Sequence, residues 1–299
     1  MQTGKALGTD VDLRLVISDI SEAEKYFSEL WGQIYDYEKR YSRFIDSSEL
    51  NNININAGQP VKISPEFKLL LEKAKYFSTL THDLFNPFIL PQLHRAGYIY
   101  SMTDAVDKNI SNYSDRQVVN SSFLEIGSDY VCIPENTAID LGGIGKGYLA
   151  DMLGNILDGK VDDYCLSLGG DMIVSGKDEN KDWNIDIQSS VDRNENIAEC
   201  IITEKKAGVA TSGLVRIKGD KEQDHLVGLN NKQNTYTMCS VLADDTTTAD
   251  VMASCILLEG EDYARGLIRQ KVVRAVLLQG GAEIIPCLLG EGFGLKKYV

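Results

Sequence analysis

The sequence predicts an α+β fold with mixed or antiparallel sheets flanked by helices, and three observations support this prediction. Apolar residues recur every three or four positions in residues 21–42, after Ser64-Pro65, and in residues 246–258 and 261–270, as in amphipathic helices. Residues 9–17 alternate apolar and polar side chains as a half-buried strand does, and most of the chain beyond residue 160 contains short apolar runs typical of strands. No repeat and no linker rich in proline, glycine or serine divides the chain, so we expect one domain, residues 1–299, in which two lobes could flank a cleft.

The balance of charge argues against a nucleic acid partner. The chain has 44 acidic and 30 basic residues, which gives a formal net charge of −14. An acidic chain lacks sequence-independent affinity for a phosphate backbone, so we expect no binding to nucleic acid. If the substrate is itself a phosphate ester, we expect a divalent cation, rather than a group of arginines, to neutralise it.

The six cysteines are expected to be small buried side chains rather than disulfides or metal ligands, because they are widely spaced and lie mostly in apolar runs. Only three histidines are present, which disfavours a histidine-rich zinc site. No apolar run approaches the roughly 18 residues that span a bilayer. The first 15 residues show no signal segment, so we expect a cytoplasmic protein; the alternative is a protein anchored on the extracytoplasmic side of the membrane after loss of an export segment.

The segment DLGGIGKGYLAD, residues 140–151, contains four glycines, more than an ordinary helix tolerates. Glycine is used where φ must be positive or where a ligand must touch the backbone. The segment matches neither the Walker A pattern nor the dinucleotide pattern G-x-G-x-x-G. We expect a strand, a loop and a helix, with Lys146 at the helix N-terminus, where backbone N–H groups favour anions. Asp140 and Lys146 suit a metal-bound or phosphate-bearing ligand, and a tight connection without a ligand is the alternative.

Three other segments carry polar residues that could belong to a site. Asp171 follows two glycines in LGGD, residues 168–171, which a β-turn alone would explain. Asp250 and Ser254 are four residues apart, so one helix face would present two hard oxygen donors; a capped helix with a solvated aspartate is the alternative. His225 follows the hydroxyl-rich run GVATSG, but a lone histidine is more often packed than catalytic.

Taken in order, these segments resemble the ApbE family, the flavin transferases that attach FMN to proteins. LGT at residues 7–9 is similar to the family's Met-Gly-Thr, and YSRFIDSSELNNIN at 41–54 to its Ser-x-aromatic and Ser-Glu-x-x-x-Asn. HDLFNPFILPQL at 82–93 is similar to its G-x-Phe-Asp-Pro-Thr-x-x-Pro-Leu. The glycine segment, LGGD, ATSG, His225 and TADVMAS then follow in the family's order, so the resemblance covers most of the chain.

The resemblance implies an ApbE-like, T-fold-like domain that cleaves the pyrophosphate of its substrate FAD with Mg²⁺. FMN would become attached, by a new phosphoester bond, to a threonine or serine of an acceptor flavoprotein subunit of the respiratory type. AMP would be released. Carried over by position, the metal ligands are the carbonyl of Gly143 and the side chains of Asp250 and Ser254, and the catalytic residues are His225, as candidate base, and Asp250. The residues expected to contact FAD or line its cleft are Leu7, Phe44, Leu84, Phe85, Asn86, Asp140, Lys146 and Asp171.

Four departures from the family's pattern fall at predicted site residues or next to them. Leu7 stands where the family has methionine, Asn86 where it has aspartate, and Ser254 where it has threonine. The usual His-x-x-Asp-Pro becomes His225-Leu-Val-Gly-Leu, which removes a carboxylate and a proline next to the candidate base. Two alternatives to transfer therefore stay open: an FAD pyrophosphatase that gives FMN and AMP, and a non-catalytic flavin-binding or trafficking protein.

Overall fold

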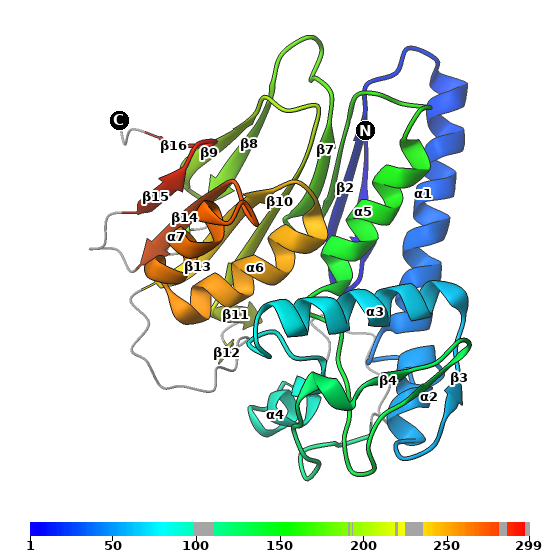
Figure 1. The fold of residues 1–299 in the computed structure, drawn as a ribbon. Coiled ribbons are helices and arrows are strands. Elements are labelled where there is room, and N and C mark those ends of the chain that lie inside the picture. Colours follow the sequence, from blue (N-terminus) through cyan, green and yellow to red (C-terminus); the bar gives the residue numbers. More distant parts are fainter. Residues whose placement is uncertain are drawn as a thin grey trace.

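The computed structural model describes residues 1–98, 111–190, 192, 194–218, 221–224, 236–280 and 286–296. Its architecture is α+β, as predicted, and an eight-stranded antiparallel sheet forms its centre (Figure 1). In spatial order the strands of this sheet are β1 (Gln2–Ala6), β2 (Thr9–Leu15), β6 (Tyr164–Leu168), β7 (Asp171–Ser175), β10 (Lys206–Gly213), β13 (Tyr236–Ala243), β14 (Ala275–Gly280) and β15 (Cys287–Gly290).

Both faces of the large sheet are buried, and alternate residues of its strands enter two different cores. In β14, Val276 and Leu278 join the core on the helical side, and Ala275 and Leu277 join the core on the other side. That second core is closed by a three-stranded sheet in the order β16 (Phe293–Leu295), β9 (Asn196–Ile202) and β8 (Trp183–Gln188). A strand that is buried on both faces reads as an unbroken apolar run, which is why the strands beyond residue 160 were detectable.

Helices cover the first face of the large sheet. α5 (Gly145–Leu157) and α6 (Thr246–Glu259) pack against each other and against the sheet, α1 (Ile20–Tyr41) packs against α5, and α7 (Glu261–Arg269) packs against α6 (Figure 1). The remaining helices are α2 (Glu49–Ile55), the long α3 (Pro65–Leu80), α4 (Leu90–Arg95) and the 3₁₀ helices η1 (Pro87–Ile89) and η2 (Ser121–Phe123). The remaining strands form a sheet of β3 (Val61–Lys62), β5 (Tyr130–Cys132) and β4 (Glu125–Ile126) and a hairpin of β11 (Val215–Lys218) and β12 (Lys221–Asp224).

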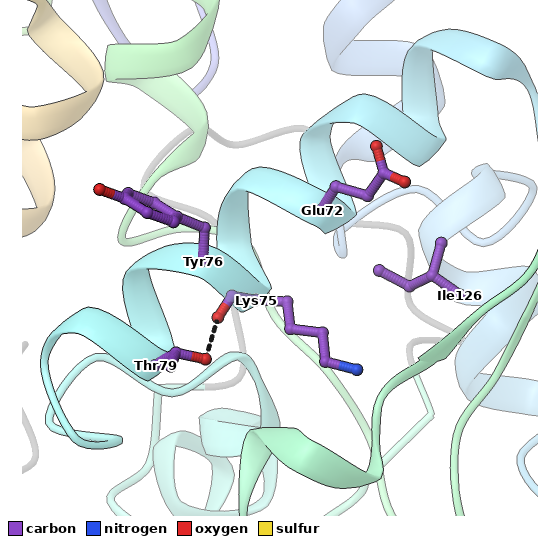
Figure 2. Close-up of a pocket in the computed structure, with 5 residues that line it drawn as sticks. All are labelled: Glu72, Lys75, Tyr76, Thr79 and Ile126. Atoms are coloured by element: carbon purple, nitrogen blue, oxygen red, sulfur yellow. Dashed lines mark hydrogen bonds between the residues drawn. The ribbon is translucent and has the colours of Figure 1, made fainter.

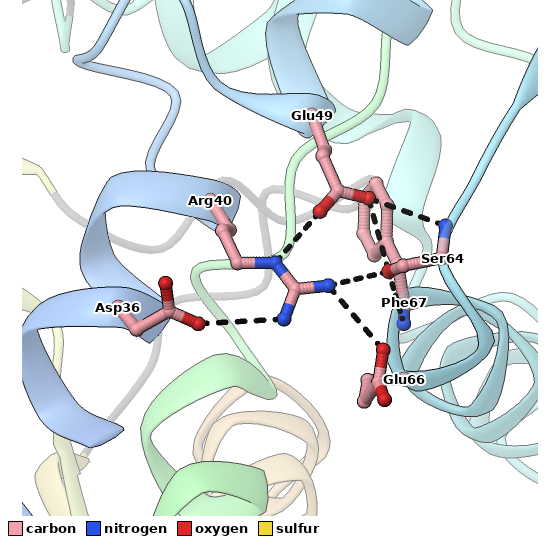
Figure 3. Close-up of polar contacts among 6 residues, drawn as sticks. All are labelled: Asp36, Arg40, Glu49, Ser64, Glu66 and Phe67. Atoms are coloured by element: carbon pink, nitrogen blue, oxygen red, sulfur yellow. Dashed lines mark hydrogen bonds and ion pairs between the residues drawn. The ribbon is translucent and has the colours of Figure 1, made fainter. Parts of the chain in front are cut away.

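The predicted helix starts are explained by their capping residues. Ser64 caps α3, and its hydroxyl accepts a hydrogen bond of 3.2 Å from the N–H of Phe67, with Pro65 at the first helical position. Arg40, in the last turn of α1, binds Glu49 of α2 at 2.7 Å and also contacts Ser64, so one guanidinium joins the ends of three helices (Figure 3). The chain path from α1 to α3 is therefore fixed by caps and by one shared cation.

One predicted strand is wrong. Residues 134–141 form no strand, although they were expected to continue the strand that enters the glycine segment. Their backbone groups bind loops and side chains instead of a neighbouring strand: the N–H of Ile139 donates to the side chain of Asn54 at 2.7 Å, and the N–H of Asp140 donates to the carbonyl of Pro87 at 2.8 Å. The predicted strand at 224–231 lies outside the described residues beyond position 224.

The other composition-based expectations concern cysteines and membrane spans. All six cysteines are free, and each is buried or half-buried, as predicted. In the parts of the chain that the structure describes, no helix combines the length and the apolar character needed to cross a membrane.

Candidate functional site

The N-terminus of α5 is the centre of the predicted site, and its glycines are explained by close approach. A Cβ on Gly147 would lie 2.6 Å from the carbonyl oxygen of Thr246 and 2.8 Å from the Cβ of Asp250. A Cβ on Gly145 would lie 3.2 Å from the hydroxyl of Tyr37. No glycine of this segment has a positive φ. The glycines therefore allow α1, α6 and the start of α5 to meet, rather than allowing a tight turn.

Asp250 is placed at this helix start. It lies in the second turn of α6, is 5% exposed, and its Oδ2 accepts a hydrogen bond of 3.0 Å from the N–H of Gly147. An ordinary helix start would give that N–H to the carbonyl of Gly143, and in the described residues this carbonyl accepts no hydrogen bond. Ile144, at the capping position, supplies no side-chain bond. The carboxylate thus replaces the missing cap and leaves the Gly143 carbonyl available to a ligand.

Ser254 lies one turn after Asp250 on the same helix face, as the spacing predicted. Its hydroxyl is 2.9 Å from the hydroxyl of Ser212 in β10. Ser212 is a neighbour that the sequence reasoning did not single out, although it belongs to the hydroxyl-rich run GVATSG. The oxygen atoms available as metal ligands are therefore those of a carbonyl, a carboxylate and hydroxyls, which are hard ligands of the kind that Mg²⁺ prefers. Among the described residues, no group of three or more histidine, cysteine or acidic side chains could hold a metal by itself.

Lys146 and Asp171 form an ion pair that joins α5 to the large sheet. Asp171 is 1% exposed and opens β7, immediately after the two-residue turn Gly169-Gly170, in which both glycines have positive φ. The turn that sequence analysis offered as the simple explanation of LGGD is present. The Asp171 carboxylate after this turn also binds Lys146 at the start of α5. The β-turn and the predicted site residue are therefore both present in LGGD.

Asp140 is buried and paired with an arginine that the sequence reasoning missed. Its Oδ1 lies 3.3 Å from Nη1 of Arg43, and its Oδ2 accepts a hydrogen bond of 3.0 Å from the N–H of Gly142. The Arg43 guanidinium is stacked on the rings of Phe44 and Tyr98, at 4.6 and 4.5 Å from their centroids. Arg43 occupies the variable position of the Ser-x-aromatic pattern, which is why the pattern gave no signal for it.

The segment around Phe85 adjoins the glycine loop. The Phe85 ring lies 3.4 Å from the position that a Cβ on Gly143 would take, and the neighbouring Leu84 is half-buried against the core. The side chain of Asn86 is used within the protein: its oxygen caps η1 at the N–H of Phe88, and its nitrogen donates to the carbonyl of Val119. Asn86 therefore shapes this wall rather than presenting free polar atoms to a ligand.

Leu7 lies in the turn between β1 and β2, at a φ of 56°, and its N–H donates to Glu38 of α1 at 2.8 Å. This turn and the Gly169-Gly170 turn are at the same end of the sheet, because Gly169 donates to the carbonyl of Asp10. Of the predicted site residues, those on α5, α6, β7 and the Phe85 segment are linked by contacts around the α5 start. His225 lies outside the described residues.

A surface pocket of about 380 Å³ lies elsewhere, between α3 and β4. Its lining residues are Glu72, Lys75, Tyr76, Thr79 and Ile126 (Figure 2). None of them is a predicted site residue, and the Thr79 hydroxyl is already bonded to the carbonyl of Lys75. Because chemistry requires reactive groups that converge, the α5 start rather than this pocket is the candidate site.

This geometry defines a class: an α+β protein in which a glycine-rich helix start meets a buried carboxylate, with a pair of hydroxyls one turn further along the second helix. Comparison with known families matches residues 7–277 to the ApbE family, and the chain belongs to that family. An FAD:protein FMN transferase of Haemophilus influenzae is 23% identical over 280 residues, covering 88% of this chain and 81% of the relative. The Klebsiella pneumoniae protein of that name is 23% identical over 312 residues, covering 97% and 85%.

Solved structures show the same fold. The ApbE protein from Thermotoga maritima has a TM-score of 0.75 at 21% identity and covers 93% of both chains. The apo flavinyl transferase ApbE from Pseudomonas stutzeri has a TM-score of 0.77 at 18% identity, covering 96% of this chain and 93% of its own. The family resemblance read from the sequence motifs is thereby confirmed.

Proposed function

We propose that this protein is an Mg²⁺-dependent FAD:protein FMN transferase. In the proposed reaction, the hydroxyl oxygen of a threonine or serine on an acceptor flavoprotein attacks the phosphorus of the FMN half of FAD. The bond from that phosphorus to the bridging oxygen breaks, AMP leaves, and the hydroxyl proton passes to a base, for which His225 is the sequence-based candidate. The names of the relatives support the use of FAD and a protein acceptor.

One observation carries the proposal for this chain. Asp250 takes the N–H of Gly147, which in the described residues leaves the Gly143 carbonyl without a hydrogen bond, and Ser254 lies one turn from Asp250 on the same face of α6. When bound there, Mg²⁺ would neutralise charge on the diphosphate. Lys146 would orient the phosphates, while Asp171 holds its ammonium in place. Phe85, which is buried next to Gly143, would support the loop, and Phe44, which is half-buried under Arg43, is the expected neighbour of an FAD ring.

The test is transfer of flavin to an acceptor domain. Purified protein, FAD, Mg²⁺ and a flavoprotein subunit with a threonine or serine acceptor site should give an acceptor band that stays fluorescent on a denaturing gel, with one AMP released for each flavin attached. Asp250→Ala should lower the rate by more than about 100-fold, beyond the range for groups that only support a metal ligand. Asp262→Asn, at an exposed acid of α7, is the matched control and should leave the rate unchanged.

The other outcomes decide between the alternatives. AMP and free FMN released without any acceptor would identify a pyrophosphatase. FAD binding that is unaffected by Asp250→Ala, with no AMP, would identify a flavin-binding protein. Either result contradicts the proposal.

A further inference from the structure

Two carboxylates cross-link α5 and α6 in a reciprocal way. Asp250 of α6 accepts from the N–H of Gly147 at the start of α5, at 3.0 Å. In the opposite direction, Asp151 of α5 accepts from the N–H groups of Thr246 and Thr247 at the start of α6, both at 2.8 Å, and from the Thr247 hydroxyl. Each helix therefore has its N-terminus capped by an aspartate of the other.

The spacing of the two bonds fixes how the helices cross. Gly147 and Asp151 are four residues apart on α5, and Thr246 and Asp250 are four residues apart on α6, so each pair occupies one face over one turn. The first residue of each pair donates to the last residue of the other pair. This arrangement holds only for one register of the two helices, because a shift of one residue would turn both carboxylates away from their donors.

The α6 start is fully occupied by this arrangement. Thr246 and Thr247 are 0% and 1% exposed, and their N–H groups are bound by Asp151. The N–H of Thr248 is bound by Asp245 at 2.8 Å. The α6 start thus has no N–H group left for an anion. Asp151 serves to place α6 rather than to bind a ligand.

We propose that Asp151 is a positioning residue for the metal site. It fixes α6 on α5, and thereby sets where the proposed ligands Asp250 and Ser254 lie relative to the start of α5. This inference rests on the proposed function, since it assigns the placement of ligands to an aspartate that lies outside the predicted ligand set. Removal of the carboxylate should release the N–H groups at the α6 start and shift Asp250 relative to Gly147. The loss in Mg²⁺ binding free energy should then exceed the loss in unfolding free energy.

The experiment measures Mg²⁺ binding and stability together. Asp151→Ala should raise the Mg²⁺ dissociation constant, measured by calorimetry with FAD present, by about 10- to 100-fold. Leu153→Ala, at a fully buried leucine of the same helix, is the matched destabilised control, and it should lower the melting temperature without changing Mg²⁺ affinity. If Asp151→Ala folds poorly, Thr247→Val removes one of the three hydrogen bonds and should cause a smaller shift in the same direction.

The outcomes separate this inference from the proposed function. Equal Mg²⁺ affinity in wild type and Asp151→Ala, or equal weakening in Leu153→Ala, overturns the positioning role. If the wild type binds no Mg²⁺, the proposed function fails instead. The reciprocal hydrogen bonding between α5 and α6 can still be tested in that case, because amide exchange at Gly147 should accelerate in Asp151→Ala and not in Leu153→Ala. Unchanged exchange at Gly147 in both variants would remove the structural basis of the inference.

Discussion

At the scale of single residues, the site is built from charges that are paired before any ligand arrives. Asp140 and Lys146 were expected to contact FAD, and each has a protein partner of opposite charge: Arg43 for Asp140, and Asp171 for Lys146. Buried charges are tolerated only when they are paired and hydrogen-bonded. The loop is thereby held in shape, and its available acceptor is a backbone carbonyl rather than a free charge.

The Arg43 and Asp140 pair gives a prediction at this scale. Arg43 is 6% exposed and Asp140 is 7% exposed, so Arg43→Ala leaves a buried carboxylate without its counter-charge. We expect a loss of about 3 to 5 kcal/mol in the free energy of unfolding, measured in urea. The double variant Arg43→Ala, Asp140→Asn should recover part of that loss, because the uncompensated charge is removed. Arg269→Ala, at an exposed arginine at the end of α7, is the control. A double variant no more stable than Arg43→Ala would contradict this account.

At the scale of elements, the crossing of α5 and α6 depends on the absence of a side chain at Gly147. Two helices that cross at such a short distance need small residues at the contact. Here the carbonyl of Thr246 occupies the space that a side chain on Gly147 would need. The sequence pattern showed that a glycine-rich segment opens a helix. It did not show that the glycines face another helix.

Gly147→Ala tests this crossing. The added methyl group would lie within 3 Å of Thr246 and Asp250, so the helices must separate, and we expect a loss of about 1 to 3 kcal/mol in unfolding free energy together with weaker Mg²⁺ binding. Gly32→Ala is the contrast: nothing lies within 4 Å of that position on the exposed side of α1, and alanine there should stabilise by up to about 1 kcal/mol. This explanation fails if Gly147→Ala and Gly32→Ala change the unfolding free energy in the same direction.

At the scale of the whole molecule, the helical layer, the large sheet and the small sheet are joined by buried contacts. The joint between α1 and the edge hairpin of the sheet includes a carboxyl group, Glu38, bound to the N–H of Leu7. Burial raises the pKa of Glu38 above its ordinary value of 4.5, although the hydrogen bond from Leu7 lowers it. The stability of the fold therefore depends on pH through this joint.

The sign follows from the direction of the shift. A carboxyl group with a raised pKa in the folded state holds its proton to a higher pH than the unfolded chain does, so its contribution to stability is present at low pH and is lost as the pH rises through the folded pKa. Glu38→Gln keeps the acceptor for Leu7 and should match the wild type near pH 4 but exceed its unfolding free energy at pH 7. Glu24→Gln, at an exposed position of α1, should not change the profile. Parallel stability curves for wild type and Glu38→Gln would count against this explanation.

The sequence by itself predicted the helices α1, α3, α5, α6 and α7, most strands of the large sheet, the free cysteines and the family. These features depend on periodicity, capping residues and ordered motifs, all of which are local in the chain. It also identified Asp250 and Ser254 as neighbours, because four residues make one helical turn. The error at residues 134–141 has the same origin, since apolar residues there satisfy their backbone through distant loops rather than a strand.

Only the tertiary structure decided which groups meet. Gly147 and Asp250 are 103 residues apart in the chain, and Asp151 and Thr246 are 95 apart, so no local pattern encodes their contact. The partner of Asp140, the neighbour of Ser254 and the freedom of the Gly143 carbonyl were likewise fixed by packing. A hydrogen bond depends on distance and direction between atoms, and the fold alone sets these for residues on separate elements.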